Sequence, residues 1–302
     1  MKRAILILCM IAVSLCLFAG CGGATKNNAA AETASSGAST NLTVKVLDVG
    51  QGDAILVQTG KQVVLIDTSD VDERDKLRKE LKKANVKALD KVILTHPHAD
   101  HIGGMDVLLK EFSVKEVYDN GMPATSPLYR NYMKLLKEKG IKLHALKAGD
   151  RLDFGDQASF FVFSPTAEMV KNGQEKGYKH EPNNESVVGK LTFGEFTMLF
   201  TGDAEKETEA QELESFAKDL KCKVIKVPHH GSKTSSSAKF LQAVAPEVGI
   251  ISCGAGNDYG HPHAPTLKQY QKVSCKVYRT DEDGTVTITT DGKNYTVKGE
   301  KK

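Results

Sequence analysis

One short segment constrains the fold of this chain more than any other, because it places metal-binding side chains directly after a buried strand. An apolar run at residues 92–94, followed by Thr95, leads into His96-Pro97-His98-Ala99-Asp100-His101-Ile102-Gly103-Gly104. Imidazole nitrogens and carboxylate oxygens are the ligands that borderline divalent metals such as Zn²⁺ prefer. Three imidazoles and a carboxylate this close together can serve two metal ions. The segment therefore predicts a metal-dependent hydrolase with its site at a strand end.

The remainder of the chain alternates between short apolar runs and amphipathic stretches. The sequence predicts strands at residues 42–47, 54–58, 63–66, 92–95, 186–193, 196–201, 224–227, 248–252, 285–289 and 295–298. It predicts helices at residues 72–85, 102–112, 127–140, 205–220, 237–244 and 264–273. Such alternation is typical of an α/β protein with both parallel and antiparallel strand pairs. Because no further low-complexity stretch interrupts it, we expect one domain over residues 41–300.

The first twenty residues have the pattern of a targeting segment. Lys2 and Arg3 precede an apolar run at residues 4–19, which is shorter than the roughly 20 residues that span a bilayer. The run ends in Leu17-Phe18-Ala19-Gly20-Cys21, which resembles the lipobox of bacterial lipoproteins. We therefore expect a signal peptide at residues 1–20, a lipid on Cys21 and anchoring to the outer face of the bacterial cell membrane. The alternatives are an ordinary cleaved signal and an uncleaved anchor.

Beyond this segment, residues 21–40 are small and polar and predict a flexible tether. The formal net charge of the chain is +3, and removal of Lys2 and Arg3 leaves 3 − 2 = +1. A nearly neutral body has no global basic field that would steer nucleic acid toward it. Cys222, Cys253 and Cys275 lie in apolar runs at no metal-like spacing, so we expect buried thiols.

Most of the histidines fall into short clusters. These clusters are His96/His98/His101, His229/His230 and His261/His263. Each follows a strand-like run or a glycine-rich loop, where α/β proteins place binding residues. Asp67 and Asp203 also follow apolar runs. Beside these histidines we expect Asp203 to bind metal rather than only to cap a helix, and Asp67 to orient a ligand imidazole.

The spacing His96-x-His98-x-Asp100-His101, with Gly103-Gly104 after it, resembles the signature of the metallo-β-lactamase superfamily. Three further stretches narrow the resemblance to the soluble hydrolase domain of ComEC-type DNA-uptake (competence) proteins. They are Asp48-Val49-Gly50-Gln51-Gly52-Asp53-Ala54, Asn183-Asn184-Glu185-Ser186-Val187-Val188 and Pro228-His229-His230-Gly231-Ser232-Lys233-Thr234-Ser235. Free-standing relatives of that domain include exported hydrolases and cell-wall phosphorylcholine esterases. The resemblance covers nearly all of residues 41–300.

This resemblance implies an αββα sandwich of two mixed sheets flanked by helices, with two divalent metal ions at one edge. It implies that His96 and His98 hold the first metal, that Asp100 and His101 hold the second, and that Asp203 bridges them. One of His229 and His230 completes the second metal. Adjacent residues on an extended segment point opposite ways, so both are not expected to be direct ligands, and His230 is slightly favoured.

Many members of the superfamily supply a third histidine to the first metal, and here Asn184 stands in that region. The first metal site is therefore expected to be weaker, oxygen-rich or tolerant of Mn²⁺, while Zn²⁺ stays the expected metal. His180 lies four residues before Asn184 and is expected to be a surface histidine.

The chemistry implied by such a site is hydrolysis, since two metal ions activate water near neutral pH and stabilise charge on the attacked group. Asp100 or Asp203 orients the attacking water, and His261 protonates the leaving oxygen. The residues expected to contact a substrate phosphate are Asn184, Ser232, Lys233 and Thr234. For Lys233 a solvated surface position is an equal alternative. For His263 a helix cap or solvent contact is expected.

These features favour an exported phosphodiesterase or nuclease that acts on DNA or related phosphodiesters. The first alternative is a hydrolase of another ester, such as a phosphorylcholine ester or a lactone. The second is a binding module for DNA or wall polymer without turnover, which the intact set of metal ligands disfavours. Aromatic residues are few and tryptophan is absent, so the sequence shows no evident stacking platform for nucleobases or choline.

Overall fold

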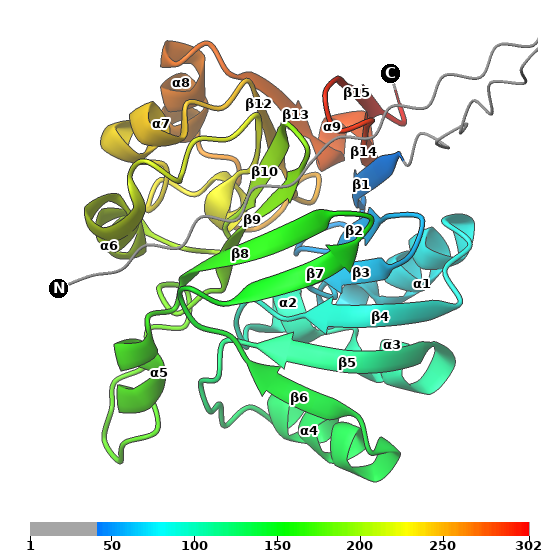
Figure 1. Ribbon diagram of the computed structural model, residues 1–302. Helices are drawn as coiled ribbons and strands as arrows, with labels where there is room; N and C mark the ends of the chain where they lie inside the picture. Colours follow the sequence, from blue (N-terminus) through cyan, green and yellow to red (C-terminus); the bar gives the residue numbers. More distant parts are fainter. Residues whose placement is uncertain (1–40, 302) are drawn as a thin grey trace, which may run out of the picture. The chain divides into compact units, whose positions relative to one another are not determined.

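The computed structural model describes residues 41–301, which form two β-sheets covered by helices (Figure 1). The expected signal peptide at residues 1–20, the expected tether at residues 21–40 and the expected lipid site Cys21 lie outside these described residues. Within residues 41–301, no helix is long and apolar enough to cross a membrane.

The first sheet has eight strands in the order β15-β14-β1-β2-β3-β4-β5-β6. Their bounds are β1 (Leu42–Val46), β2 (Ile55–Gln58), β3 (Val63–Ile66), β4 (Ala88–Ile93), β5 (Ser113–Asp119), β6 (Lys142–Ala145), β14 (Val286–Thr290) and β15 (Tyr295–Gly299). The strands from β3 to β6 run parallel, and the other neighbours pair antiparallel. The sheet is therefore mixed, as the alternation in the sequence predicts.

The second sheet has seven strands in the order β13-β12-β11-β10-β9-β8-β7. Their bounds are β7 (Arg151–Gly155), β8 (Ala158–Ser164), β9 (Val188–Phe193), β10 (Phe196–Phe200), β11 (Val224–Lys226), β12 (Val248–Ile251) and β13 (Lys276–Arg279). Strands β10 to β13 are parallel, and the hairpins β7–β8 and β9–β10 are antiparallel. The predicted hairpin around Gly194-Glu195 is confirmed as β9–β10.

Helices cover the outer faces of both sheets (Figure 1). Their bounds are α1 (Arg74–Lys83), α2 (Ala99–Ile102), α3 (Met105–Glu111), α4 (Pro127–Lys139), α5 (Ala167–Asn172), α6 (Lys206–Phe216), α7 (Ala238–Val244), α8 (Ala264–Lys272) and α9 (Thr280–Asp283), with the 3₁₀ turns η1 (Val71–Glu73) and η2 (Pro228–Gly231). In α4, the Ser126 hydroxyl accepts a hydrogen bond from the Tyr129 N–H, Pro127 opens the first turn and Gly140 ends the helix with φ 65°. These local signals place α4 where the sequence predicts a helix.

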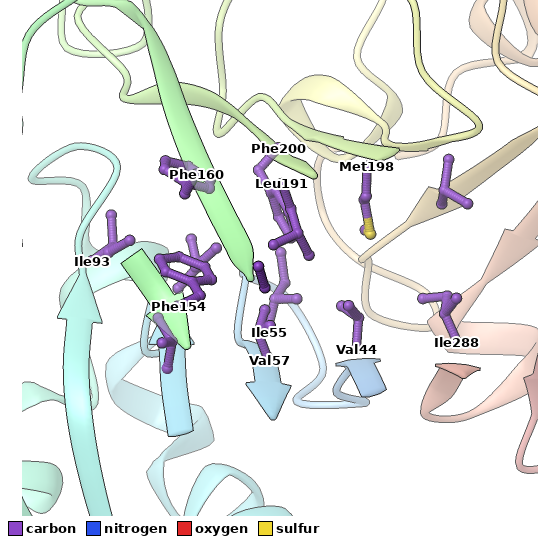
Figure 2. Close-up of a cluster of buried hydrophobic side chains, with 14 of the residues drawn as sticks. Val44, Ile55, Val57, Ile93, Phe154, Phe160, Leu191, Met198, Phe200 and Ile288 are labelled. Atoms are coloured by element: carbon purple, nitrogen blue, oxygen red, sulfur yellow. The ribbon is translucent and has the colours of Figure 1, made fainter. Parts of the chain in front are cut away.

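The inner faces of the two sheets pack against each other around one apolar layer (Figure 2). Val44, Val57 and Ile288 of the first sheet face Leu191 and Met198 of the second. Two further apolar clusters lie on the outer faces, one against α1, α3 and α4 and the other against α7 and α8. The expected αββα sandwich is confirmed. Cys222, Cys253 and Cys275 are buried and unpaired, as expected.

The structure differs from the sequence expectation at several elements. Strands β5, β6, β7, β8 and β13 were not predicted, because charged or polar residues break the apolar pattern in most of them. The predicted helix at residues 102–112 is divided into α2 and α3 at Gly103 and Gly104. A Cβ atom at Gly103 would lie 2.3 Å from the Val71 nitrogen, and one at Gly104 would lie 2.3 Å from the Thr68 oxygen. The glycines therefore let this segment pack directly on the backbone that follows β3.

A buried carboxylate at the end of β5 gives a prediction about stability. Burial raises the pKa of Asp119 to about 6, although its hydrogen bond from the Gly121 N–H opposes the rise. The folded pKa exceeds the unfolded value, so the contribution of Asp119 to stability is most favourable at low pH and falls as the pH rises from about 4 through about 6. Asp119→Asn keeps the acceptor oxygen. We expect it to stabilise the protein by about 2–3 kcal/mol at pH 7 and by almost nothing at pH 4.

Urea unfolding at the two pH values measures this difference. The matched control is Asp153→Asn, since exposed Asp153 accepts an equivalent hydrogen bond from the Gly155 N–H. That variant should stay within about 0.5 kcal/mol of the unmodified protein at both pH values. An Asp119→Asn effect that is equal at pH 4 and pH 7 would contradict the assignment.

Candidate metal centre

Loops that follow strand ends bring the candidate residues together. Asp67 follows β3, the segment from His96 to His101 follows β4, Asp203 follows β10, the pair His229-His230 follows β11, and His261 lies in the loop after β12. The strands β3 and β4 are parallel neighbours in one sheet, and β10, β11 and β12 are parallel neighbours in the other. The carboxyl ends of parallel strands in one sheet open onto the same edge. The fold therefore collects side chains that are up to 194 residues apart in the sequence.

Four of these side chains form a compact group that can hold a metal ion. Asp100, His101, Asp203 and His230 offer ligand atoms that all lie within 4.8 Å of one another. Nε2 of His230 lies 3.2 Å from Oδ2 of Asp100 and 3.5 Å from Oδ1 of Asp203. Nε2 of His101 lies 3.3 Å from the same Asp203 oxygen. The group contains the residues expected at the second metal, with His230 rather than His229 as the added histidine.

The electrostatics of this group favour a bound cation. His101 Nε2 and Asp203 Oδ1 are buried and have no hydrogen-bond partner among the described residues. Burial by itself would lower the pKa of His101, but the carboxylates of Asp203, Asp67 and Asp100 hold that pKa well above its usual value. The surroundings thus stabilise a positive charge here, which a proton or a metal ion supplies. Two imidazoles and two carboxylates fit a divalent ion such as Zn²⁺ or Mn²⁺.

Asp203 faces histidines through both of its oxygens. Oδ1 lies near His101 and His230, whereas Oδ2 lies 3.8 Å from Nε2 of His229.

His96 and His98, the residues expected at the first metal, lie next to each other, with Nε2 of His96 3.0 Å from Nδ1 of His98. Burial, together with the charge of His101, lowers the pKa of His96 well below its usual value, so this imidazole is neutral and able to donate a lone pair. The assignment of His96 and His98 to a first metal stays a prediction.

Hydrogen bonds to the far nitrogens fix which imidazole nitrogen faces the group. Nδ1 of His101 donates to Oδ2 of Asp67 over 2.8 Å, and Nδ1 of His230 donates to the Ser252 carbonyl over 2.9 Å. Asp67 is itself held by Thr95, whose N–H and hydroxyl donate to its two oxygens over 2.7 and 2.8 Å. Both histidines therefore keep Nε2 unprotonated for a metal when they are neutral.

The backbone at His229 and His230 differs from the extended segment that the sequence suggests. The two residues lie in η2 and have φ values of 48° and 50°, which is the left-handed region. Such conformations cost about 1–3 kcal/mol each and persist where the surrounding structure holds them. His230 turns toward Asp100, while Nδ1 of His229 lies 3.1 Å from Glu205 and 3.1 Å from the Thr234 hydroxyl. Both rings also turn Nε2 toward Asp203, so the segment is not the extended one expected, and the expectation that only one of the two histidines binds metal stays a prediction.

Behind the group lies a buried ion pair that the sequence analysis did not assign. Nζ of Lys226, the last residue of β11, lies 2.8 Å from Oδ2 of Asp53, and both side chains are almost fully buried. Oδ1 of Asp53 lies 3.5 Å from Nδ1 of His230. For Asp53, the sequence offered one signal, its place in the stretch from Asp48 to Ala54. For Lys226 it offered none, since a lysine at a strand end is ordinary. The pair packs directly against the imidazole that joins the metal group.

An open pocket of about 360 Å³ leads to the metal group. Its lining residues include Asp100, Asp203, His230, Asn183, Gln51 and Tyr259. The expected phosphate contacts lie elsewhere. Asn184 is engaged with α6, since its Oδ1 accepts from the Glu205 N–H and the Thr208 hydroxyl. It is Asn183, one residue earlier, that lines the pocket.

The other expected phosphate contacts lie in the loop after η2. The Ser232 hydroxyl accepts hydrogen bonds from the Thr234 N–H and hydroxyl, so these two residues hold the loop together. Lys233 is exposed, and its N–H donates to Nδ1 of His263. None of the three lines the pocket. His263 supports this loop from the position before α8 and makes no side-chain cap to that helix.

Two other histidines have distinct surroundings. His261 lines the pocket, and burial, together with the charges of His230, His229 and His263, lowers its pKa to about 4. The ring is therefore neutral at pH 7. It can act as a proton donor only when a nearby anion raises this pKa enough for the ring to be protonated. His180 is not a free surface residue. Its Nδ1 lies 3.2 Å from the buried carboxylate of Glu185, away from the metal group.

Comparisons with known proteins agree with this fold. ComE operon protein 3 of Bacillus subtilis is 35% identical over 263 residues, which is 80% of this chain and 32% of that protein. Competence protein ComA of Neisseria gonorrhoeae is 29% identical over 242 residues, which is 80% of this chain and 31% of that protein. The chain thus spans about a third of the length of these relatives.

The fold itself has a solved counterpart. The metallo-beta-lactamase fold protein YhfI from Bacillus subtilis covers 83% of this chain and 100% of its own, with a TM-score of 0.56 and 15% sequence identity. At that identity the likeness concerns the fold alone. Residues 47–255 match the sequence profile of the family described as the metallo-beta-lactamase superfamily, and this match includes β2 to β12 and the whole metal group. The chain belongs to the metallo-beta-lactamase superfamily.

Proposed function

We propose that this protein is a phosphodiesterase or nuclease that uses two divalent metal ions, Zn²⁺ or alternatively Mn²⁺, to cleave DNA or a related phosphodiester. We also propose that it acts at the outer face of the bacterial membrane through a lipid on Cys21, which the lipobox-like sequence supports. The observation that carries the proposed activity is the group Asp100, His101, Asp203 and His230 at the base of an open pocket. The similarity to ComE operon protein 3 and to competence protein ComA, together with the resemblance to the hydrolase domain of DNA-uptake proteins, supports a nucleic-acid substrate.

The residues of the pocket suit an anionic substrate once cations are present. When bound, two metal ions would supply Lewis acidity and a water molecule that is activated near neutral pH. Asp100 and Asp203 hold the cations and provide acceptors that orient this water. Asn183 and His261 line the same pocket and can contact the substrate, and His261, when its ring is protonated, is the proposed proton donor to the leaving oxygen.

A panel of substrates tests the proposal. The protein loaded with Zn²⁺ or Mn²⁺ is assayed on bis-p-nitrophenyl phosphate, single-stranded DNA, plasmid DNA, a choline phosphodiester and a lactone. We expect hydrolysis of bis-p-nitrophenyl phosphate and of DNA, and about two metal ions per chain by elemental analysis. A chelator should abolish the activity. His98→Ala should lose both its activity and its bound metal. His180→Ala, which alters a histidine outside the pocket, should retain both.

Other results would replace the proposal. A lactone or choline phosphodiester turned over far faster than DNA would favour the alternative ester hydrolases. Tight binding of DNA with no cleavage in either metal would favour a binding module.

A further inference from the structure

The pocket has an aromatic wall that the composition does not reveal. Tyr259 is the one large hydrophobic residue that is exposed among residues 41–301, with 65% of its surface accessible, and it lines the same pocket as Asp100 and Asp203. Its ring stacks on His261, with centroids 5.6 Å apart and planes 17° from parallel. His261 in turn stacks on His230 at 6.2 Å. The structure thus places an exposed aromatic ring beside the metal group.

The loop that carries Tyr259 is held in place. Nδ2 of Asn257 donates to the Gly254 carbonyl over 2.9 Å and to the His261 carbonyl over 2.6 Å, and Oδ1 of Asn257 accepts from the His261 N–H over 3.0 Å. The Gly254 N–H also donates to Oε1 of Gln51, which lines the pocket. A platform that is already fixed loses little conformational entropy when a ligand stacks on it.

Unpaired polar atoms surround the same wall. Nε2 of Gln51, Nδ1 of His261 and Oδ1 of Asn183 are buried and have no hydrogen-bond partner among the described residues, and all three residues line the pocket. Buried polar atoms are normally paired, so unpaired ones in a pocket point to a ligand that supplies the missing partners. This ligand must offer a flat π-face together with hydrogen-bond donors and acceptors.

We propose that Tyr259 and His261 form a nucleobase subsite next to the metal group, so that the substrate is single-stranded nucleic acid with a base stacked on Tyr259. A nucleobase has a flat face for the ring and polar edges for Gln51 and Asn183. The quaternary ammonium of choline has no hydrogen-bonding group for those atoms. A base in a duplex is already stacked and cannot lie on Tyr259. This inference rests on the proposed phosphodiesterase function and specifies its substrate class.

Binding of matched oligonucleotides tests the subsite without depending on cleavage. The Zn²⁺-loaded full chain is titrated, by fluorescence anisotropy, with a phosphorothioate oligo-dT and with an abasic strand that has the same number of phosphorothioates. We expect oligo-dT to bind more tightly than the abasic strand by roughly 5- to 100-fold. Tyr259→Ala should remove this difference, and Tyr259→Phe should keep most of it. Tyr178→Ala is the matched control, since Tyr178 contacts His180 outside the pocket.

Each outcome decides the inference. Equal binding of oligo-dT and the abasic strand, or no binding of either, overturns it. A choline phosphodiester whose binding depends on Tyr259, while oligo-dT binding does not, overturns it in favour of a quaternary ammonium. Hydrolysis of bis-p-nitrophenyl phosphate without a preference for bases leaves the proposed function standing and removes the subsite. Tyr259-dependent binding of oligo-dT without hydrolysis of any phosphodiester supports the subsite and contradicts the proposed phosphodiesterase function.

Discussion

Replacing Asp203 with asparagine should lower the proposed phosphodiesterase activity by more than about a hundredfold, because loss of a residue that only supports a metal ligand already lowers metal affinity or activity about 10- to 100-fold. Asp203 Oδ1 lies 3.3 Å from His101 and 3.5 Å from His230, and Oδ2 lies 3.8 Å from His229. The amide keeps the shape of the side chain and removes the charge that attracts a cation. We therefore expect fewer than two metal ions per chain in Asp203→Asn.

A metal-dependent change in thermal stability gives a second readout for the same variant. A ligand at 100 times its Kd stabilises a folded protein by about 2.7 kcal/mol, which corresponds to a rise of about 5–10 °C in Tm for a domain of this size. The unmodified protein should show this rise with Zn²⁺, and Asp203→Asn should show little of it. Asp75→Asn, at an exposed position on α1, should behave like the unmodified protein. Full metal content and activity in Asp203→Asn would refute the central role of this residue.

Replacing Lys226 with methionine should destabilise the fold by about 3–5 kcal/mol, since it removes the lysine that neutralises the buried carboxylate of Asp53. The double variant Asp53→Asn/Lys226→Met carries no buried charge at these positions. We expect it to recover a large part of the loss, because replacing both members of a buried pair costs much less than replacing one. Urea unfolding of the two single variants and the double variant measures this coupling.

An exposed pair provides the control for this cycle. Lys134 and Glu138 lie one turn apart on α4 with 73% and 54% of their side chains accessible, so Lys134→Met should cost less than about 0.5 kcal/mol. The buried pair also contacts His230 through Asp53, so Lys226→Met should weaken metal binding as well. A double variant that is as unstable as the sum of its single variants would show that the two charges do not stabilise each other.

The sequence by itself determined the local parts of this protein. The strand before His96 and the spacing from His96 to Asp100 and His101 are contiguous, so periodicity and ligand chemistry predict them. The ends of α4 follow from Ser126, Pro127 and Gly140, which act within one turn. The two mixed sheets follow from the alternation of strands and helices together with the resemblance. Strands such as β5 escaped prediction, because the adjacent charged residues Lys115 and Glu116 interrupt its apolar pattern and only pairing with β4 and β6 makes it a strand.

The tertiary structure decided what the distant residues do. Only the left-handed turn at residues 229 and 230 selects His230 for the group with Asp100, and only the packing of β11 places Lys226 against Asp53. Asn183, and not the predicted Asn184, lines the pocket, and Tyr259 is exposed there. Both results depend in the same way on loops that are far apart in sequence. The physical reason is that ligand chemistry belongs to a residue type, whereas the direction in which a side chain points is set by long-range contacts that no local pattern contains.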